Sequence, residues 1–255
     1  MSGKPAMIGS DAGLAGAQTS RALMELRDLI ASGSIAAEER LTETQLAEML
    51  GMSRTPIRAA VQHLREEGLL EPRPGGGYVA RAFGPREIGE AVELRGMIEG
   101  LAARLLAERG IDRAVLARLD ETVAGIDAAI GAPRFGTDQI LAYVRLNAEF
   151  HAALAEATES TLIVQEARRA NARPFAGASA LVRVRENIEA TRDHLIVAQD
   201  QHKAVLEAIE AREGARAEAI MREHARLSRR NLARALRDRE SLAAVPGANL
   251  IRRSG

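Results

Sequence analysis

Cysteine is absent from this 255-residue chain, and aromatic side chains make up only 2% of it. Without cysteine the chain has no disulfide framework, no thiolate nucleophile and no cysteine-ligated zinc or iron–sulfur site. The scarcity of aromatic side chains argues against a surface that stacks the bases of single-stranded nucleic acid. Apolar residues nevertheless account for 46% of the chain and charged residues for 27%, so it can bury a sizeable core in one large domain or two small ones.

Long apolar runs are also missing. The first residues, Met1 to Gly13, contain no uninterrupted apolar segment of signal-peptide length. No stretch approaches the ~18 apolar residues that are needed to cross a bilayer. We therefore expect a cytoplasmic protein without a membrane partner.

An excess of either charge is lacking as well, because 35 basic residues balance 35 acidic ones. This balance does not exclude nucleic-acid binding, since the local placement of charge decides it. The strongest basic run is 214–239, with eight arginines and three acidic residues. Its arginines wrap around the expected helix and do not form one stripe. This pattern favours ion pairs on a solvated face over a second nucleic-acid surface or a membrane surface.

Residues 19–82 show the order of elements of a small DNA-binding domain. Residues 1–18 before them are rich in Gly, Ala and Ser without periodicity, so we expect a flexible arm there. Apolar residues at helical spacing predict one helix from Thr19 to Gly33 and another over 43–50, and Ser53 is the expected N-cap of a third. Two short extended pieces then flank a Gly/Pro turn within residues 68–79. This order predicts a winged helix-turn-helix.

The rest of the chain, residues 86–240, has a helical pattern throughout. Glycines and prolines divide it into six predicted helices, over 86–109, 112–130, 137–157, 160–178, 185–212 and 214–239. Such helices form an all-α bundle of six or seven helices with room for a ligand between them. The last residues, 241–255, are expected to be a flexible tail. The expected fold class is therefore mainly α.

The third helix has two distinct faces. Ile57, Val61 and Leu64 share one side of it, and polar side chains that can grip a phosphate or a base edge occupy the other. Gly75 and its neighbours would let a wing approach the DNA backbone closely. The candidate DNA contacts are Arg54, Thr55, Arg58 and Gln62, with Thr44 before them and Arg73, Gly75 and Gly76 in the wing. The alternative is an amphipathic helix whose arginines merely face water.

Three of the five histidines can meet in the helical part. Asn147 and His151 lie one turn apart on one helix face. His202 and His224 lie on two helices that fold back on each other near Gly214, which places them at similar heights. Together these side chains could surround one divalent cation, with positions left open for water or a ligand. The alternative is that the histidines are ordinary surface or core residues; His63 and His194 are read in that way.

Two stretches carry a resemblance to known families. Residues 41–70, with Ser-Arg-Thr-Pro-Ile-Arg at 53–58, resemble the GntR family of bacterial transcription regulators. This resemblance implies that Arg54, Thr55 and Arg58 contact DNA and that the Gly-rich wing reaches the minor groove. Residues 94–104, 147–151, 201–202 and 221–224 resemble the FCD effector domain of the FadR subfamily. In its metal-binding members the ligands are one Asp and three His, which fall here on Asn147, His151, His202 and His224.

The first of these positions departs from the family, because Asn147 stands where the family has Asp. A neutral ligand set leaves a bound Zn²⁺ or Ni²⁺ its full charge, which should strengthen its attraction for a carboxylate effector. An Asn147→Asp change should then tighten metal binding and weaken binding of the anion. Arg95 is a candidate second contact for such an anion. The alternative for Arg95 is an ion pair with Glu99, four residues later.

These observations predict a transcription repressor that binds double-stranded DNA. A homodimer would place two recognition helices about one DNA turn apart on a pseudo-palindromic operator. A small organic acid, bound at the metal, would release the operator. The alternative is a metal-dependent enzyme or a metabolite-binding protein that uses the histidine cluster. No His-Glu-x-x-His, nucleophile elbow or phosphate-binding loop supports an enzyme, and Glu149 points to a different helix face from His151.

Overall fold

The computed structural model describes residues 10–179, 188–237, 242, 245 and 247–252. The chain forms two units, one made of residues 1–83 with 249–252 and the other of 84–248 with 253–255. Each unit is described by itself below. None of the helices in the described ranges is long and apolar enough to span a membrane.

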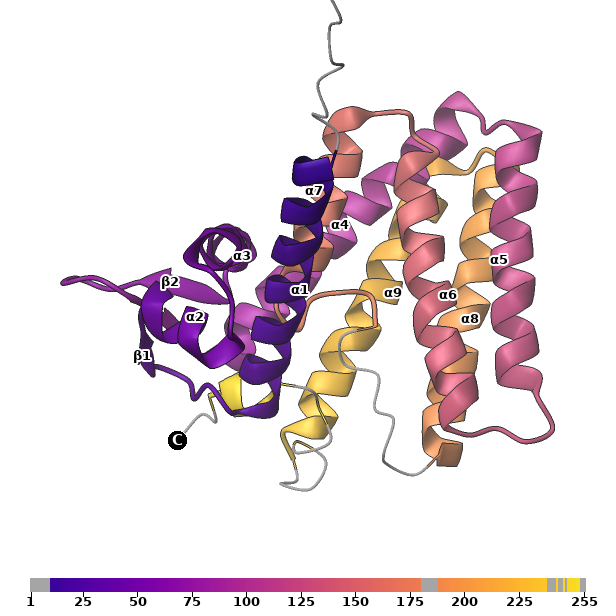
Figure 1. Cartoon of the computed structure of the whole chain (residues 1–255). Coiled ribbons are helices and arrows are strands. Elements are labelled where there is room, and N and C mark those ends of the chain that lie inside the picture. The colour runs from indigo at the N-terminus through magenta and orange to yellow at the C-terminus, as the bar shows by residue number, and fades with distance from the viewer. Residues whose placement is uncertain (1–9, 180–187, 238–241, 243–244, 246, 253–255) are drawn as a thin grey trace, which may run out of the picture. The chain divides into compact units, whose positions relative to one another are not determined.

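The first unit is a winged helix-turn-helix, as the sequence predicts (Figure 1). Its helices and strands are α1 (Ser10–Ser32), β1 (Arg40–Leu41), α2 (Glu43–Leu50), α3 (Arg54–Glu66), β2 (Leu70–Pro72) and β3 (Tyr78–Ala80). The strands form an antiparallel sheet in the order β1-β3-β2, and Tyr78 pairs with both Leu41 and Pro72. The connection between β2 and β3 is the wing.

Local chemistry fixes the turn between α2 and α3. Thr42 caps α2, and its hydroxyl and the Gln45 side chain form a reciprocal capping box. Gly51 ends the helix in the left-handed region, at φ 61°, where a residue without Cβ is unstrained. The apolar faces of α1, α2 and α3 then meet in a core of buried side chains that includes Leu26, Ile30, Leu46, Ile57, Val61 and Leu64.

The expected arm over residues 1–18 is wrong for its second half, because α1 begins at Ser10 and not at Thr19. Three alanines and Leu14 favour a helix there, and no proline or β-branched residue interrupts it. The apolar periodicity begins later, with the buried Ala22 and Leu26. Helix propensity therefore extends α1 beyond the part that packs. Residues 1–9 lie outside the described residues.

The expected flexible tail is wrong for residues 249–252, which pack on the first unit. Backbone hydrogen bonds join Phe83 N to Leu250 O at 2.6 Å and Arg252 N to Phe83 O at 2.9 Å, next to a parallel bridge between Phe83 and Ile251. Asn249 Nδ2 donates to Ile30 O at 3.1 Å. Leu250 and Ile251 are buried because the first unit offers them apolar surface. The sequence pattern of a short tail does not show such a partner.

We expect Leu250→Ala to lower the free energy of unfolding of the first unit by about 2–5 kcal/mol, because it leaves a cavity at a side chain that is 1% exposed. Urea unfolding followed by amide hydrogen exchange in α1 measures this change. Leu162→Ala is the matched control, since that leucine is 68% exposed and should change the value by less than about 0.5 kcal/mol. Equal effects of the two changes would contradict packing of the tail.

The second unit contains six helices in the described residues, which confirms the predicted all-α bundle (Figure 1). They are α4 (Pro85–Arg109), α5 (Arg113–Gly131), α6 (Thr137–Glu156), α7 (Thr161–Ala172), α8 (Ile188–Glu210) and α9 (Gly214–Ala235). The predicted helix 160–178 is too long, because Pro174 disfavours a helical Arg173, which is extended at ψ 137°. The start expected for α8, residues 185–187, lies outside the described residues.

Close packing of α4 against α9 positions the interior of this unit. A Cβ at Gly96 would lie 2.8 Å from Ala225 Cβ, and one at Gly100 would lie 3.1 Å from Glu218 O. Glycine at these two positions lets the helices approach, so that α4 residues reach the side chains of α9. The adjoining core consists of buried apolar side chains such as Phe150, Leu154, Val205, Ile209 and Met221.

Candidate functional site

The arginines of α3 lie on its exposed face. The side chains of Arg54 and Arg58 are 60% and 67% exposed, whereas Ile57 and Leu64 are buried. This is the arrangement that the helical spacing predicts. Ser53 occupies the N-cap position but makes no side-chain capping hydrogen bond. The N-terminal turn of α3 therefore keeps backbone donors that can face a phosphate.

Glu43, at the start of α2, holds both arginines. Its Oε2 lies 3.1 Å from Arg58 Nε and 3.5 Å from Arg54 Nη2, and Tyr78 donates its hydroxyl to Oε1 at 3.5 Å. One carboxylate thus gathers two guanidinium groups that the sequence places 11 and 15 residues away. The sequence reasoning missed Glu43, because an acidic residue in a first helical turn is ordinary there.

The wing is a tight turn of three glycines. It is held by Arg40, the second residue that the sequence reasoning missed. Gly75, Gly76 and Gly77 have φ values of 83°, 92° and 80°, which side chains with a Cβ rarely adopt. Arg40 in β1 donates from Nε to Gly76 O at 2.9 Å and from Nη2 to Gly75 O at 2.5 Å. Arg73 closes the turn through backbone hydrogen bonds to Gly76 and Gly77. Arg40 therefore fixes the part of the wing that the sequence predicts to approach DNA.

The remaining predicted DNA contacts are exposed side chains of α2 and α3. Thr44 and Thr55 are exposed. Gln62 is exposed and is held between two neighbours, since it donates to Glu66 at 2.9 Å and accepts from Arg65 at 2.8 Å. All three side chains are available to a partner in solution.

Three histidines meet in the interior of the second unit. His151 comes from α6, His202 from α8 and His224 from α9, and all three are buried. Nε2 of His224 lies 3.2 Å from Nε2 of His151 and 3.2 Å from Nε2 of His202. Two imidazoles on one metal at about 2.0–2.1 Å place their nitrogens roughly 2.9–3.4 Å apart. Both measured separations suit adjacent ligands of one ion.

The second nitrogens of two rings lie near oxygen acceptors. Gln199 donates its amide to Val123 O at 2.8 Å, so its Oε1 is left to accept from His202 Nδ1 at 3.1 Å. His151 Nδ1 lies 3.1 Å from Glu99 Oε2. With protons on both Nδ1 atoms, the Nε2 lone pairs of His151 and His202 face His224 Nε2, which carries at most one proton. A Lewis acid satisfies all three nitrogens, so the donor set fits a metal ion.

Burial keeps the imidazoles of His202 and His224 neutral. It lowers the pKa of His202 and of His224 well below 6.5, and the positive charge of neighbouring His151 lowers both further. The charge of His202 also lowers the pKa of His224. Neutral imidazole is the form that binds metal.

Glu99 is the buried carboxylate beside this cluster. Burial raises its pKa, but the charges of the neighbouring His151 and Arg95, with a hydrogen bond from Asn171, outweigh burial and lower the pKa to about 2. Asn171 Nδ2 donates to Glu99 Oε1 at 2.9 Å. Glu99 is therefore an anion throughout the physiological pH range.

Asn147 lies one turn before His151 on α6 and is fully buried. Its hydrogen bonds join it to two neighbours, since Oδ1 accepts from the Tyr143 hydroxyl at 3.3 Å and Nδ2 donates to Ser179 Oγ at 2.9 Å. Burial raises the pKa of Tyr143, so this hydroxyl stays protonated and remains a donor. The structure thus brings nitrogens of three of the four predicted ligands to within 4.8 Å of one another, and the fourth, Asn147, lies one helical turn before His151.

Arg95 is 1% exposed and lies between α4 and α9. Its Nη2 donates to Ser228 Oγ at 3.1 Å, and its Nη1 lies 3.7 Å from Glu99 Oε2. The ion pair with Glu99, the alternative weighed for Arg95, is therefore present. Among the described residues, however, Nε and Nη1 of this guanidinium have no hydrogen-bond partner. Two donors of this buried side chain are thus left unsatisfied within the described part of the chain.

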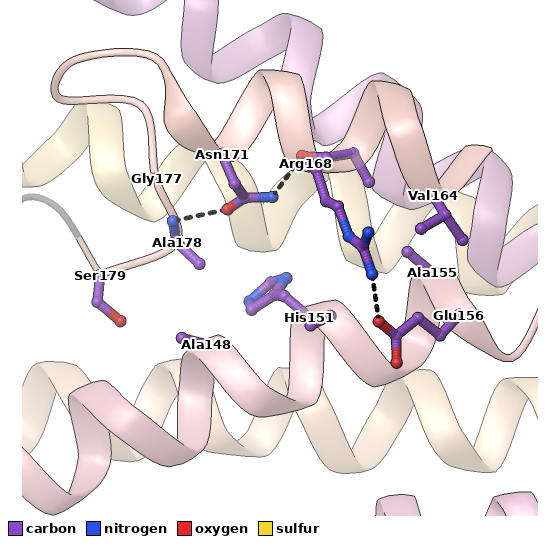
Figure 2. A pocket seen from close by; sticks show the side chains of 12 residues that line it. Ala148, His151, Ala155, Glu156, Val164, Arg168, Asn171, Gly177, Ala178 and Ser179 are labelled. Carbon is purple, nitrogen blue, oxygen red and sulfur yellow. Dashed lines mark hydrogen bonds and ion pairs between the residues drawn. The ribbon is translucent and has the colours of Figure 1, made fainter. Parts of the chain in front are cut away.

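A pocket of about 330 Å³ opens next to His151. Figure 2 shows His151 on α6 facing the segment that carries Ala178 and Ser179. Alanines make up much of the wall, and Asn171 and Ser179 add polar groups. Arg168 and Glu156 form an ion pair at 2.9 Å on one side. The volume suits a small organic molecule.

The family comparisons fit both units. Residues 18–79 match the family described as "Bacterial regulatory proteins, gntR family", and residues 90–227, more than half of the chain, match the FCD domain. The chain is a GntR-family transcription regulator with an FCD domain. This family consists of DNA-binding regulators and not of enzymes, so the alternative of a metal-dependent enzyme is not retained.

Individual relatives of this GntR-family regulator agree. The HTH-type transcriptional regulator YdhC of Bacillus subtilis is 30% identical over 52% of the chain and 57% of its own length. The "Probable D-xylose utilization operon transcriptional repressor" of Paenarthrobacter nicotinovorans is 28% identical over 76% of the chain and 80% of its length. The structure of E. coli McbR/YncC has 22% identity and a TM-score of 0.57, and the match covers 85% of this chain and 95% of that one. This last likeness supports the fold.

Proposed function

We propose that the protein is a metal-containing repressor whose operator affinity is lowered by a small carboxylate effector. The observation that carries the metal is the meeting of three buried Nε2 atoms, in which Nε2 of His224 lies 3.2 Å from each of the other two. A repressing role is supported by the Paenarthrobacter nicotinovorans relative, which is named as a probable transcriptional repressor.

In this proposal His151, His202 and His224 hold Zn²⁺ or Ni²⁺, and Asn147, one turn before His151 on α6, contributes its amide oxygen. The metal supplies a positive charge for an anionic ligand. Because every one of these side chains is neutral, none of that charge is cancelled by the ligands themselves.

The effector enters through the pocket beside His151 and is held by its carboxylate. Arg95 is the second contact that we propose, since Nε and Nη1 are buried without hydrogen-bond partners among the described residues. A guanidinium in that state gains most from a carboxylate, which can accept two parallel hydrogen bonds. A titration of the operator complex with small mono- and dicarboxylates tests this step. Release of DNA by at least one of them is expected, and failure of all of them with metal present would contradict it.

On DNA, α3 enters the major groove. Arg54, Thr55, Arg58 and Gln62 contact bases and phosphates, Thr44 adds a contact from α2, and Arg73, Gly75 and Gly76 bring the wing to the backbone. Release of Arg54 and Arg58 from Glu43 would free their guanidinium groups for guanine. A homodimer would present two such helices to the half-sites of a pseudo-palindromic operator.

We expect Arg58→Ala to weaken operator binding by about 1–3 kcal/mol, or roughly 5–150-fold, because it removes a charged fork from the reading face. Gel-shift titration on the promoter fragment upstream of the protein's own gene measures this change. Arg145→Ala is the matched control, since that arginine is 64% exposed on α6 in the other unit. Undiminished affinity of the Arg58 variant would remove this residue from the DNA site.

A further inference from the structure

We propose that Glu99 is the positioning residue of the metal centre and supplies the anionic charge that Asn147 does not. This inference rests on the proposed metal site and assigns a role to a residue outside the ligand set. Glu99 is the only acidic side chain classed as buried in the described parts of the chain. It comes from α4, and the three histidines come from α6, α8 and α9.

The contact is made on the side of the ring that faces away from the cluster. Glu99 Oε2 lies 3.1 Å from His151 Nδ1, while His151 Nε2 lies 3.2 Å from His224. A carboxylate at Nδ1 keeps the proton on that nitrogen, which leaves the Nε2 lone pair for the metal. The same negative charge makes the imidazole a stronger donor. Gln199 likewise keeps the proton of His202 on Nδ1, but the Gln199 amide carries no charge.

Glu99 is itself fixed in place. Asn171 on α7 donates to its Oε1 at 2.9 Å, and its other oxygen is the one that faces His151. Gly96 and Gly100, on either side of Glu99 along α4, let this helix approach α9. The close packing of α4 on α9 thus places the Glu99 carboxylate in the interior of the unit, where acidic side chains are rare.

An ion pair with Arg95 does not by itself explain why the Glu99 carboxylate is buried beside the histidines. Arg95 Nη1 lies 3.7 Å from Glu99 Oε2, whereas His151 Nδ1 lies 3.1 Å from the same oxygen. The hydrogen bond that Arg95 does make goes to Ser228. Glu99 is thus closer to the metal-ligating imidazole than to the arginine on its own helix.

The charge of the whole centre also calls for an anion. Three neutral imidazoles and Asn147 leave a divalent ion at its full charge, and the buried Arg95 adds another positive charge nearby. Glu99 supplies a carboxylate from behind His151, where it contacts the imidazole and not the proposed ion. The metal keeps more of its positive charge toward an open coordination position, while the buried centre still has a compensating anion.

A mutant cycle on the full-length, tag-free chain tests this proposal, with Zn²⁺ affinity measured by competition against a chromogenic chelator. Glu99→Gln keeps the shape of the side chain and removes the charge, and it should weaken Zn²⁺ binding by about 10–100-fold. Asn147→Asp should strengthen binding. In the Asn147→Asp background, Glu99→Gln should lower the Zn²⁺ affinity by a clearly smaller factor than it does in the wild type, because the new carboxylate on α6 then supplies the negative charge.

The outcomes separate this inference from the proposed function. Equal Zn²⁺ affinity of wild type and Glu99→Gln, with the wild type binding one ion, overturns the role of Glu99 and leaves the metal site standing. A wild type that binds no Zn²⁺ or Ni²⁺ overturns both. A readout independent of metal and of any variant is the ring tautomer of His151 in the metal-free chain, observed by ¹H–¹⁵N NMR. The proposal expects protonation at Nδ1, and a ring protonated mainly at Nε2 would contradict it.

Discussion

Substitution of His224 by alanine is expected to abolish tight binding of Zn²⁺ and Ni²⁺. Its Nε2 is the atom that the other two histidines share, at 3.2 Å from each, so its loss leaves two nitrogens that no longer surround a common point. The wild-type chain should contain close to one metal per chain. In the presence of metal at 100 times its Kd, it should gain about 2.7 kcal/mol of stability. For a chain of this size that corresponds to a rise in Tm of roughly 5–11 °C.

Elemental analysis of protein purified without a histidine tag gives the metal content, and melting followed by circular dichroism gives the shift in Tm. His63→Ala is the matched control, because it removes an imidazole of α3 that is 58% exposed and belongs to the first unit, whereas the cluster belongs to the second. The control should bind metal and melt like the wild type. Full loading of the His224 variant, or an empty wild type after addition of Zn²⁺, would contradict the metal centre.

The histidine cluster shows how much of the site helical spacing predicts. Asn147 and His151 share a face because they are four residues apart. His202 and His224 meet because they lie at similar distances before and after the break at Gly214, which allows α8 and α9 to run back along each other. Helical spacing accounts for each of these two pairs, whereas the resemblance to the FCD domain is what joins the two pairs in one site. The amphipathic faces of α3 follow from the same periodicity.

The residues that hold these groups in place were not predictable in the same way. Glu43, Arg40 and Glu99 act on partners that are 15, 36 and 52 residues away, in elements whose relative placement depends on packing. In the sequence each of them resembles an ordinary charged residue of a helix or a strand. The buried position of Glu99 follows from the glycines that bring α4 close to α9, and nothing in local spacing indicates that approach.

The second large effect that we expect is a loss of folding stability at acidic pH. The metal-free protein is expected to lose about 2.7 kcal/mol of its free energy of unfolding between pH 7.5 and pH 5.5. The unfolded chain protonates His202 and His224 near pH 6.5, whereas burial and neighbouring positive charge hold their folded pKa values well below that. Below pH 6.5 the unfolded state therefore binds two protons that the folded state does not. Stability falls with decreasing pH, by about 1.4 kcal/mol per pH unit for each group.

Urea unfolding of the chelator-treated chain at pH 7.5, 6.5 and 5.5 measures this loss. Glu99 does not contribute in this window, because its folded pKa of about 2 and its ordinary value of 4.5 both lie below it. A chain in which His202 and His224 are both replaced by glutamine should show a nearly flat profile over the same range. Bound metal should raise the stability of the wild type at every pH in this range without flattening the decline, because the folded chain already holds both imidazoles neutral and the protons are taken up by the unfolded state. An equally steep decline in the glutamine variant would mean that other groups carry the acid sensitivity and that these two imidazoles do not resist protonation in the folded state.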